Sequence, residues 1–227
     1  MKILLIGNGA REHCIGEALT KSGRAELHVF GNKKNPGLAR ITHHYHIGNY
    51  MDFRELLEYA KKVQPDFAFI GPDDPIGAGA VDALLTLDIH SVAPLQTVAR
   101  LESSKSFTRD LVEKYKIPGN PKFRVFLETA GIRAFIEELG GEYVVKADGL
   151  MGGKGVKVSG EHLNSIDEGV AFAEESVKNF GRVVIEEKLI GEEFSLMSFA
   201  DGTHVSDMPA VQDHKRAFEG DTGPNTG

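Results

Sequence analysis

Strand-like and helix-like patterns alternate over the first hundred residues, and this alternation limits the possible folds more than any other feature. Short apolar runs predict strands at Lys2–Ile6, Leu27–Phe30, Phe67–Ile70 and Ile89–Val92. Apolar residues at helical spacing predict helices at Glu12–Thr20, Phe53–Val63 (with Asp52 as N-cap) and Ala78–Leu87. Such alternation is typical of an α/β fold with a parallel sheet and helices on both faces. Ligands of these sheets bind at the carboxyl ends of the strands.

A second region follows this pattern. Thr97–Tyr115 predicts one helix, and Ile117–Pro121, with two prolines and a glycine, predicts a hinge. A compact unit then follows, with strands expected at Phe123–Phe126, Tyr143–Ala147, Gly155–Val158 and Arg182–Glu186 and helices at Glu128–Leu139 and Ser165–Lys178. After Gly191 the pattern becomes antiparallel, with strands at Glu193–Phe199 and His204–Met208 and a turn at Asp201-Gly202.

The segment Lys146–Val156 holds four glycines and two lysines within eleven residues. Glycines let backbone N–H groups turn toward an anion, and lysines add charge that suits polyphosphate. No Gly-Lys-Ser/Thr opens a helix here, so the segment is not a P-loop. It predicts either a nucleotide phosphate cover of another kind or a plain glycine-rich hairpin turn.

Two loops that follow predicted strands are further candidate sites. Gly7-Asn8-Gly9-Ala10 before a helix start favours a phosphate or phosphosugar, whereas the dinucleotide fingerprint would need glycine where Glu12 stands. In Gly71–Pro75, the Asp73 carboxylate is suited to hold sugar hydroxyls or an amine, and an ordinary polar turn is an equal interpretation.

Two other segments invite a ligand. His43, His44 and His46 suggest a metal, but no carboxylate or cysteine lies at ligand spacing, so a surface strand is favoured. The segment Val183–Ser195 runs from an apolar strand through a short linker into carboxylates. Its backbone is suited to pair with an adenine edge and a later carboxylate with ribose hydroxyls, although alone it also fits a solvated acidic turn.

Charge and cysteine content exclude several classes. The net charge of -7 makes nucleic acid a poor partner. Cys14 is the single cysteine, so no internal disulfide forms, which fits a reducing cytoplasm, and we expect its side chain to be buried. No apolar run is long enough to span a membrane.

Taken together, these motifs resemble the ATP-grasp superfamily and, within it, the glycinamide ribonucleotide synthetase (phosphoribosylamine–glycine ligase) family. The resemblance covers nearly the whole chain, through Gly7–His13, Ser104-Lys105, Lys146–Leu150, Gly152–Val156, Glu186–Glu193, Gln212–Arg216 and Gly223–Gly227. The last two segments are the most specific to this family. The implied fold is a Rossmann-like, pre-ATP-grasp domain (1–101), parts of a central ATP-grasp domain (102–120 and 189–227) and a small α+β lid subdomain (121–188).

The implied reaction joins glycine to 5-phosphoribosylamine and splits ATP, in the second step of de novo purine biosynthesis, through an acyl phosphate of glycine. The resemblance implies ATP and Mg²⁺ (or Mn²⁺) as cofactors and a cytoplasmic location. Alternatives are a non-catalytic nucleotide- or phosphosugar-binding fragment and another ATP-grasp carboxylate–amine ligase.

The resemblance assigns roles to individual residues. For ATP it implies Lys105, Lys146, Gly149, Gly152, Gly153, Lys154, Gly155, Glu186, Glu187, Lys188, Leu189 and Glu193. For phosphoribosylamine it implies Gly9, Arg11, Glu12 and Asp73, for glycine Asn225 and Thr226, and for the reacting centre Asp213, Lys215 and Arg216. Family members usually have glutamate at the position of Asp73 and Gly-Gly at Gly9-Ala10.

The family pattern continues past Gly227, so the resemblance implies that this chain is the front half of the enzyme. The acid and amide ligands for the metal are then expected in the remaining half, and no metal ligand is assigned here. That half is either a continuation of this chain or a separate chain. We expect no nucleic-acid or membrane partner.

Overall fold

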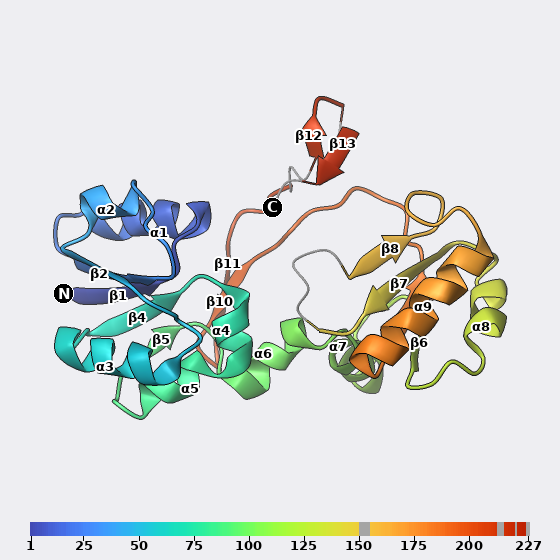
Figure 1. The fold of residues 1–227 in the computed structure, drawn as a ribbon, viewed down its shortest axis with the longest axis horizontal. Helices are drawn as coiled ribbons and strands as arrows, with labels where there is room; N and C mark the ends of the chain where they lie inside the picture. The colour runs from blue at the N-terminus through green and yellow to red at the C-terminus, as the bar shows by residue number, and fades with distance from the viewer. Residues whose placement is uncertain (150–154, 213–215, 221, 226–227) are drawn as a thin grey trace.

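A computed structural model describes residues 1–149, 155–212, 216–220 and 222–225. The N-terminal part is a five-stranded parallel sheet in the order β3-β2-β1-β4-β5, which confirms the predicted α/β class (Figure 1). The strands are β1 (Lys2–Ile6), β2 (Glu26–Gly31), β3 (His44–Ile47), β4 (Phe67–Ile70) and β5 (Ser91–Val92). β3 confirms the surface-strand interpretation of the histidine segment, and β5 is shorter than expected.

Helices cover both faces of this sheet because alternate residues of β1 point to opposite sides. Ile3 and Leu5 pack toward one face, and Leu4 and Ile6 join the core of the other. The first face carries α1 (Ala10–Thr20) and α2 (Leu38–Ile41), and the second carries α3 (Phe53–Val63) and α5 (Ala80–Leu85) (Figure 1). Asp52 caps α3 as predicted, since its Oδ1 accepts from the N–H groups of Arg54 (3.0 Å) and Glu55 (3.3 Å).

Several local predictions for this domain are wrong. Asp73 does not lie in a turn, because α4 (Asp73–Ala78) begins there, and Gly79 separates α4 from α5 with a φ of 103° that favours glycine. The expected helix Ala78–Leu87 is therefore split and shortened. Cys14 is exposed rather than buried, because α1 turns Gly16 toward the Leu27 and Leu38 side chains.

The predicted helix Thr97–Tyr115 is also two helices, α6 (Gln96–Ser103) and α7 (Lys105–Lys114). Ser104 between them has extended backbone angles (φ −136°, ψ 106°), and its hydroxyl accepts from the N–H of Phe107 at 3.3 Å. A serine in this role competes with helix continuation, and it places Lys105 at the first position of α7.

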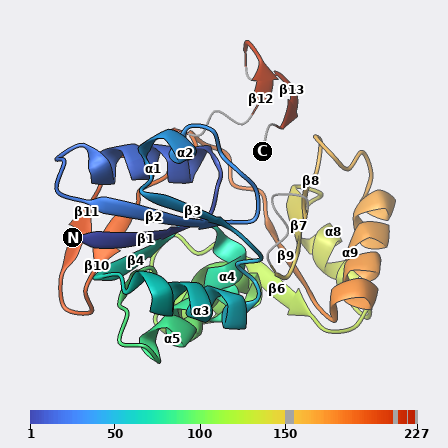
Figure 2. The ribbon, with the colours of Figure 1, turned by 60° about the vertical axis from the view of Figure 1, so that its left-hand side comes forward.

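The lid subdomain contains the predicted strands and helices. Its four strands form an antiparallel sheet in the order β6-β9-β7-β8. Its elements are β6 (Phe123–Phe126), α8 (Ile132–Glu138), β7 (Tyr143–Ala147), β8 (Val156–Val158), α9 (Ile166–Phe180) and β9 (Val183–Glu187). Figure 2 shows α8 and α9 on the side of this sheet that faces away from the N-terminal domain. α8 starts later than expected, after Gly131 in a left-handed conformation.

The last region is extended and exposed. β10 (Ser198–Ala200) and β11 (Val205–Asp207) pair around the predicted turn, and β12 (Arg216–Phe218) pairs with β13 (Thr222–Asn225). The strand expected at Glu193–Phe199 is wrong over most of its length, since apart from β10 it shows only a bridge between Ser195 and Val211. None of the helices in the described ranges has the length and apolar character needed to cross a bilayer.

Candidate functional site

The two faces of the lid sheet differ in chemistry. Tyr143, Val145 and Ile185 belong to the apolar core beneath α8 and α9. Because side chains alternate along a strand, Lys146 on β7 and Glu186 on β9 point to the opposite face. This open face carries Lys146 and Glu186, and α7 approaches it through Arg109.

Glu186 is at the centre of an ion-paired group on this face. Glu186 is buried, with 4% of its surface exposed. Its Oε1 contacts the Lys146 ammonium, and its Oε2 accepts from Arg109 Nε at 2.7 Å. The side chain expected near adenine therefore points to two cations. We call Arg109, Lys146 and Glu186 the buried charge triad.

Asp148 connects the end of β7 to the start of α7. Its Oδ1 accepts from the N–H of Lys105 at 2.6 Å, and its Oδ2 accepts from the hydroxyl of Ser106 at 2.5 Å. Lys105 Nζ donates in turn to the carbonyl of Gly149 at 2.7 Å. These bonds hold Lys105 at the beginning of the glycine-rich segment, although more than forty residues separate the two in sequence.

Lys146 lies close enough to Lys105 to affect the pKa of the Lys105 ammonium. Burial lowers the pKa of Lys105, and the neighbouring charge of Lys146 lowers it further, while Asp148 and Glu102 oppose both effects. Lys105 on α7 thus contacts Gly149, while Lys146 on β7 is near enough to act on its charge and contacts Glu186. Of the other predicted loop residues, Gly155 accepts from the N–H of Ala147 at 2.8 Å, and Gly152, Gly153 and Lys154 lie outside the described residues.

At the end of β9, Glu187 and Lys188 have engaged polar groups. The N–H of Glu187 donates to the carbonyl of Lys122 (2.9 Å), and the N–H of Lys188 donates to that of Glu142 (3.2 Å). The Glu187 carboxylate accepts from the N–H of Lys122, and Lys188 Nζ donates to the carbonyl of Ser159 at 3.0 Å. Leu189 is 66% exposed, and Glu193 is also exposed.

A second cluster lies at the carboxyl ends of β1 and β4, which are adjacent in the sheet. Arg11 Nη1 donates to the carbonyl of Gly71 at 3.0 Å and lies 3.8 Å from Asp73 Oδ1. Glu12 is 5% exposed and accepts from the N–H of Gly9 at 2.5 Å, so it caps the start of α1. The structure therefore brings these four predicted residues together and gives Glu12 a structural contact.

The close packing of Glu12 accounts for the glycines around it. A Cβ on Gly7 would lie 2.7 Å from Glu12 Cγ, and one on Gly71 would lie 2.1 Å from Glu12 Oε1. Both positions need glycine for space, and Gly7 also has a φ of 121°. The loop after β1 is thus fixed by a buried carboxylate rather than by a third glycine.

The predicted residues near the C-terminus are only partly described. Arg216 on β12 and Asn225 on β13 are register partners. Asp213, Lys215 and Thr226 lie outside the described residues.

The described part of the chain holds no group of three or more His, Cys, Asp or Glu residues suited to a metal ion. The histidines of β3 have partners of other kinds. His44 Nδ1 lies 2.9 Å from the Tyr59 hydroxyl, and His46 Nε2 lies 3.1 Å from Glu55 Oε1.

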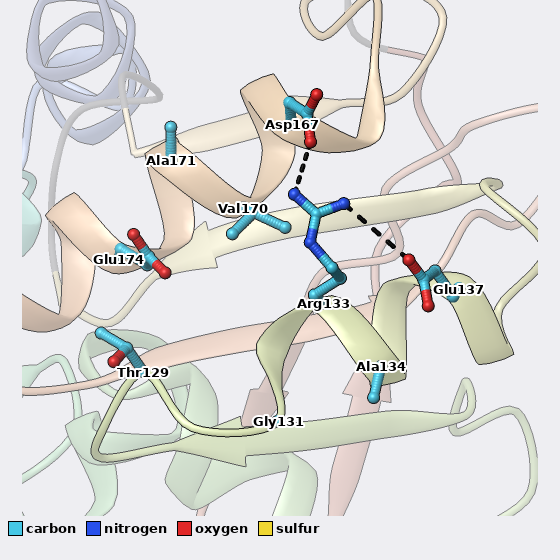
Figure 3. A pocket seen from close by; sticks show the side chains of 9 residues that line it. All are labelled: Thr129, Gly131, Arg133, Ala134, Glu137, Asp167, Val170, Ala171 and Glu174. Atoms are coloured by element: carbon cyan, nitrogen blue, oxygen red, sulfur yellow. Dashed lines mark hydrogen bonds and ion pairs between the residues drawn. The ribbon is translucent and has the colours of Figure 1, made fainter.

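A hollow of about 570 Å³ lies on the outside of the lid, between α8 and α9 (Figure 3). Arg133 extends into it and forms ion pairs with Asp167 and, at 3.8 Å, with Glu137. The helix-covered core separates this hollow from Lys146, so we locate the candidate site on the open face instead.

Sequence reasoning missed two residues of the site. Arg109 follows Lys105 by four positions, and this spacing would have placed both on one face of a helix. Asp148 stands directly before the first glycine of the loop, but its partners Lys105 and Ser106 are too distant in sequence for any local pattern to reveal them.

Comparisons with known proteins match both regions of the chain. Residues 1–102 match the family model of the phosphoribosylglycinamide synthetase N domain. Residues 103–227 match that of the phosphoribosylglycinamide synthetase ATP-grasp (A) domain. Phosphoribosylamine–glycine ligases from Pyrococcus furiosus and Thermococcus gammatolerans are 47% and 46% identical over 227 residues, all of this chain and 52% of theirs.

Solved structures give the same result for the fold. The crystal structure of phosphoribosylamine–glycine ligase from Thermotoga maritima is similar, with a TM-score of 0.80 and 32% identity, over 100% of this chain and 54% of that one. An N5-carboxyaminoimidazole ribonucleotide synthetase in complex with ADP has a TM-score of 0.70 at 17% identity, over 92% of this chain and 53% of that one, and shows the fold alone. The chain spans about half the length of the curated relatives it matches.

Proposed function

Because the chain belongs to the phosphoribosylglycinamide synthetase family, we propose that it is the N-terminal part of a phosphoribosylamine–glycine ligase. The complete enzyme joins glycine to 5-phosphoribosylamine and releases ADP and phosphate, in the second step of de novo purine biosynthesis. It works in the cytoplasm on small molecules. One observation carries the proposal. Lys105 on α7 donates to the carbonyl of Gly149 in the glycine-rich segment, and Lys146, on the open face of the lid sheet, lies near enough to lower the pKa of Lys105.

The two lysines would bind the phosphates of ATP. Phosphoryl transfer from ATP to the glycine carboxylate depends mainly on positioning and on neutralising charge. Lys105, held by Asp148 and Gly149, supplies a positive charge at a fixed place beside the glycine-rich segment. That segment, 149–155, would then cover the phosphates through Gly149, Gly152, Gly153, Lys154 and Gly155.

The adenine would lie along the linker after β9. The N–H groups of Glu187 and Lys188 already donate to carbonyls of the lid. We therefore assign adenine recognition to the N–H of Leu189 and to carbonyl oxygens of the linker, with Glu193 beyond it for the ribose. Glu186 contributes through its buried carboxylate rather than by touching the base.

Phosphoribosylamine would bind at the carboxyl ends of β1 and β4. Gly9 offers backbone and Arg11 a guanidinium for the phosphate, while Asp73 faces the amine or the ribose hydroxyls. Glu12 holds Gly9 in place from below. Asn225 and Thr226 are assigned to glycine, and Asp213, Lys215 and Arg216 to the reacting centre.

The reaction also needs Mg²⁺ or Mn²⁺, which neutralises charge on the phosphates of ATP. The described donor groups do not form a metal cluster. We assign the metal ligands to the half of the ligase that the matched relatives have beyond this region, which is either a continuation of this chain or a separate one.

That half would cover the exposed apolar side chains of residues 189–218. Ile190 is 89% exposed, Val205 70% and Phe194 65%, and all lie in the region matched by the ATP-grasp model. Soluble proteins seldom expose such a concentration of apolar groups without a partner. A segment matching the second half of the relatives should therefore co-purify with this chain.

Calorimetric titration with ATP tests the nucleotide site. Lys146→Ala should weaken ATP binding by about 1.5–3 kcal/mol, the range for hydrogen bonds to charged groups. Lys157→Ala is the matched control, because Lys157 lies on the neighbouring strand and packs over Phe172, on the helix-covered face. Equal affinity in the Lys146→Ala variant and the wild type, with the fold intact, would mean that Lys146 is misassigned.

Titration of the wild type also separates the ligase from a passive module. ATP binding without ADP formation in the completed enzyme would identify a non-catalytic binding fragment, which the half-length match makes worth testing.

A further inference from the structure

The buried charge triad contains one more positive charge than negative charge, and this excess has a consequence for nucleotide binding. Arg109 and Lys146 both contact Glu186, whose side chain is 6% exposed. The inference below rests on the proposed function, in which Lys146 binds a phosphate of ATP.

Lys146 has to change partners when ATP arrives. Its ammonium contacts Glu186 Oε1. If it were the carboxylate's one cation, its departure would leave a buried, unpaired charge, which is strongly unfavourable. Exposing or protonating Glu186 would then cost free energy and weaken the binding of ATP.

We propose that Arg109 is a positioning residue that keeps Glu186 neutralised and so leaves Lys146 available for ATP. Arg109 Nε donates to Glu186 Oε2, the oxygen that Lys146 does not contact, at 2.7 Å. The two cations therefore do not compete for one atom. When Lys146 turns to a phosphate oxygen, the Glu186–Arg109 bond persists.

Arg109 is the cation better fixed in place. Its Nη1 donates to Asn120 Oδ1 at 3.3 Å, and Asn120 Nδ2 donates back to the Arg109 carbonyl at 3.4 Å. A planar guanidinium also makes several directed bonds at once, whereas a lysine ammonium rotates on a flexible stem. Arg109 is thus the cation that stays paired with Glu186, and Lys146 is the cation that can leave.

A stability experiment without nucleotide tests this division directly. Lys146→Met imitates the departure of the lysine while keeping its apolar stem. In the wild-type background it should lower the urea midpoint only slightly, because Arg109 still pairs with Glu186. In the Arg109→Met background the same change should lower the midpoint by about 1 M more, because the carboxylate is then unpaired.

Glu186→Gln provides the control for charge. In that background the two methionine substitutions should act additively, since no buried carboxylate remains to be neutralised. Equal shifts for Lys146→Met with and without Arg109 would overturn the proposal. So would non-additivity that persists after Glu186→Gln.

ATP titration gives an independent measure. Arg109→Met should raise the dissociation constant for ATP about tenfold, which corresponds to about 1.4 kcal/mol. Adding Glu186→Gln to Arg109→Met should recover most of the affinity. Arg133→Met is the matched control, because Arg133 also pairs with carboxylates in the lid but lies on its outer side (Figure 3), and it should bind ATP like the wild type.

The two experiments separate this inference from the proposed function. A wild-type chain that binds no ATP would contradict the ATP site of this chain, while the stability cycle would still decide the role of Arg109. Normal ATP affinity in Arg109→Met would instead contradict the role of Arg109 and leave the ATP site in place.

Discussion

At the scale of single residues, Tyr59 gives a pH-dependent test of the N-terminal core. Burial raises the pKa of its hydroxyl from the ordinary tyrosine value of 10.0 to about 12. Between these values the folded protein keeps a proton that the unfolded chain loses, so the unfolded chain binds fewer protons and stability falls as pH rises. The free energy of unfolding of the wild type should fall by up to about 2.7 kcal/mol as pH rises, at 1.36 kcal/mol per pKa unit. Tyr59→Phe should remove this decrease.

Urea unfolding of both proteins from pH 9 to pH 12 checks the prediction. Phe cannot replace the hydrogen bond between the Tyr59 hydroxyl and His44, so the variant starts from lower stability at pH 9. The two stability curves should then approach each other as pH rises. Curves that stay parallel would show that Tyr59 does not keep its proton in the folded state.

The roles of Lys105 and Lys146 in ATP binding stay predictions from the motifs that contain them. The structure shows that Lys105 contacts Gly149 and that Lys146 lies near enough to lower the pKa of Lys105. The sequence does not predict what a side chain contacts. Glu186, which the resemblance assigns to the adenine site, is buried between Arg109 and Lys146. Such pairings depend on the packing of α7 against β9, which no local pattern encodes.

At the scale of elements, the contact of α9 with β7 depends on Gly169. A Cβ at this position would lie 2.0 Å from the hydroxyl oxygen of Tyr143, a buried residue that donates to the carbonyl of Ser165. Glycine to alanine within a helix is normally stabilising. Here the clash should make the substitution destabilising instead. Gly169→Ala should lower the free energy of unfolding by about 1–3 kcal/mol, as overpacking does.

Thermal or urea unfolding of Gly169→Ala measures this effect. Tyr143→Phe would leave the ring carbons Cζ and Cε2, which would lie 2.5 Å and 2.6 Å from the new Cβ. Combining Gly169→Ala with Tyr143→Leu removes the whole ring, so the double variant should lose less stability than the sum of the two single variants. A gain in stability for Gly169→Ala alone would mean that α9 can move away from β7 at no cost.

Strands with continuous apolar runs are predicted well, and β1 and β4 have the predicted bounds. β6 and β7 also have the predicted bounds, although each contains one charged residue. The pattern failed at Ser104, where helical periodicity continues but the backbone does not. Ser104 caps α7 locally, and a contact outside the segment adds to this, since Asp148 accepts from the N–H of Lys105. Long-range contacts of this kind override local propensity.

At the scale of the whole molecule, alternation of strands and helices predicted the parallel sheet, and the resemblance predicted the lid and the half-length match. The order of the strands and the antiparallel lid sheet required the structure, because pairing depends on contacts between distant segments. The region after the lid was predicted poorly. Its strands are short and its side chains exposed, so neither burial nor periodicity marks their ends.

As proposed above, this chain supplies the ATP and phosphoribosylamine sites of a ligase whose other half lies beyond this region. The most direct test combines the chain with the second half of the ligase and measures ADP release. We predict ADP release only when ATP, glycine and 5-phosphoribosylamine are all present, and its loss when Lys146 is replaced by alanine. ADP release that is unchanged without glycine would contradict the account.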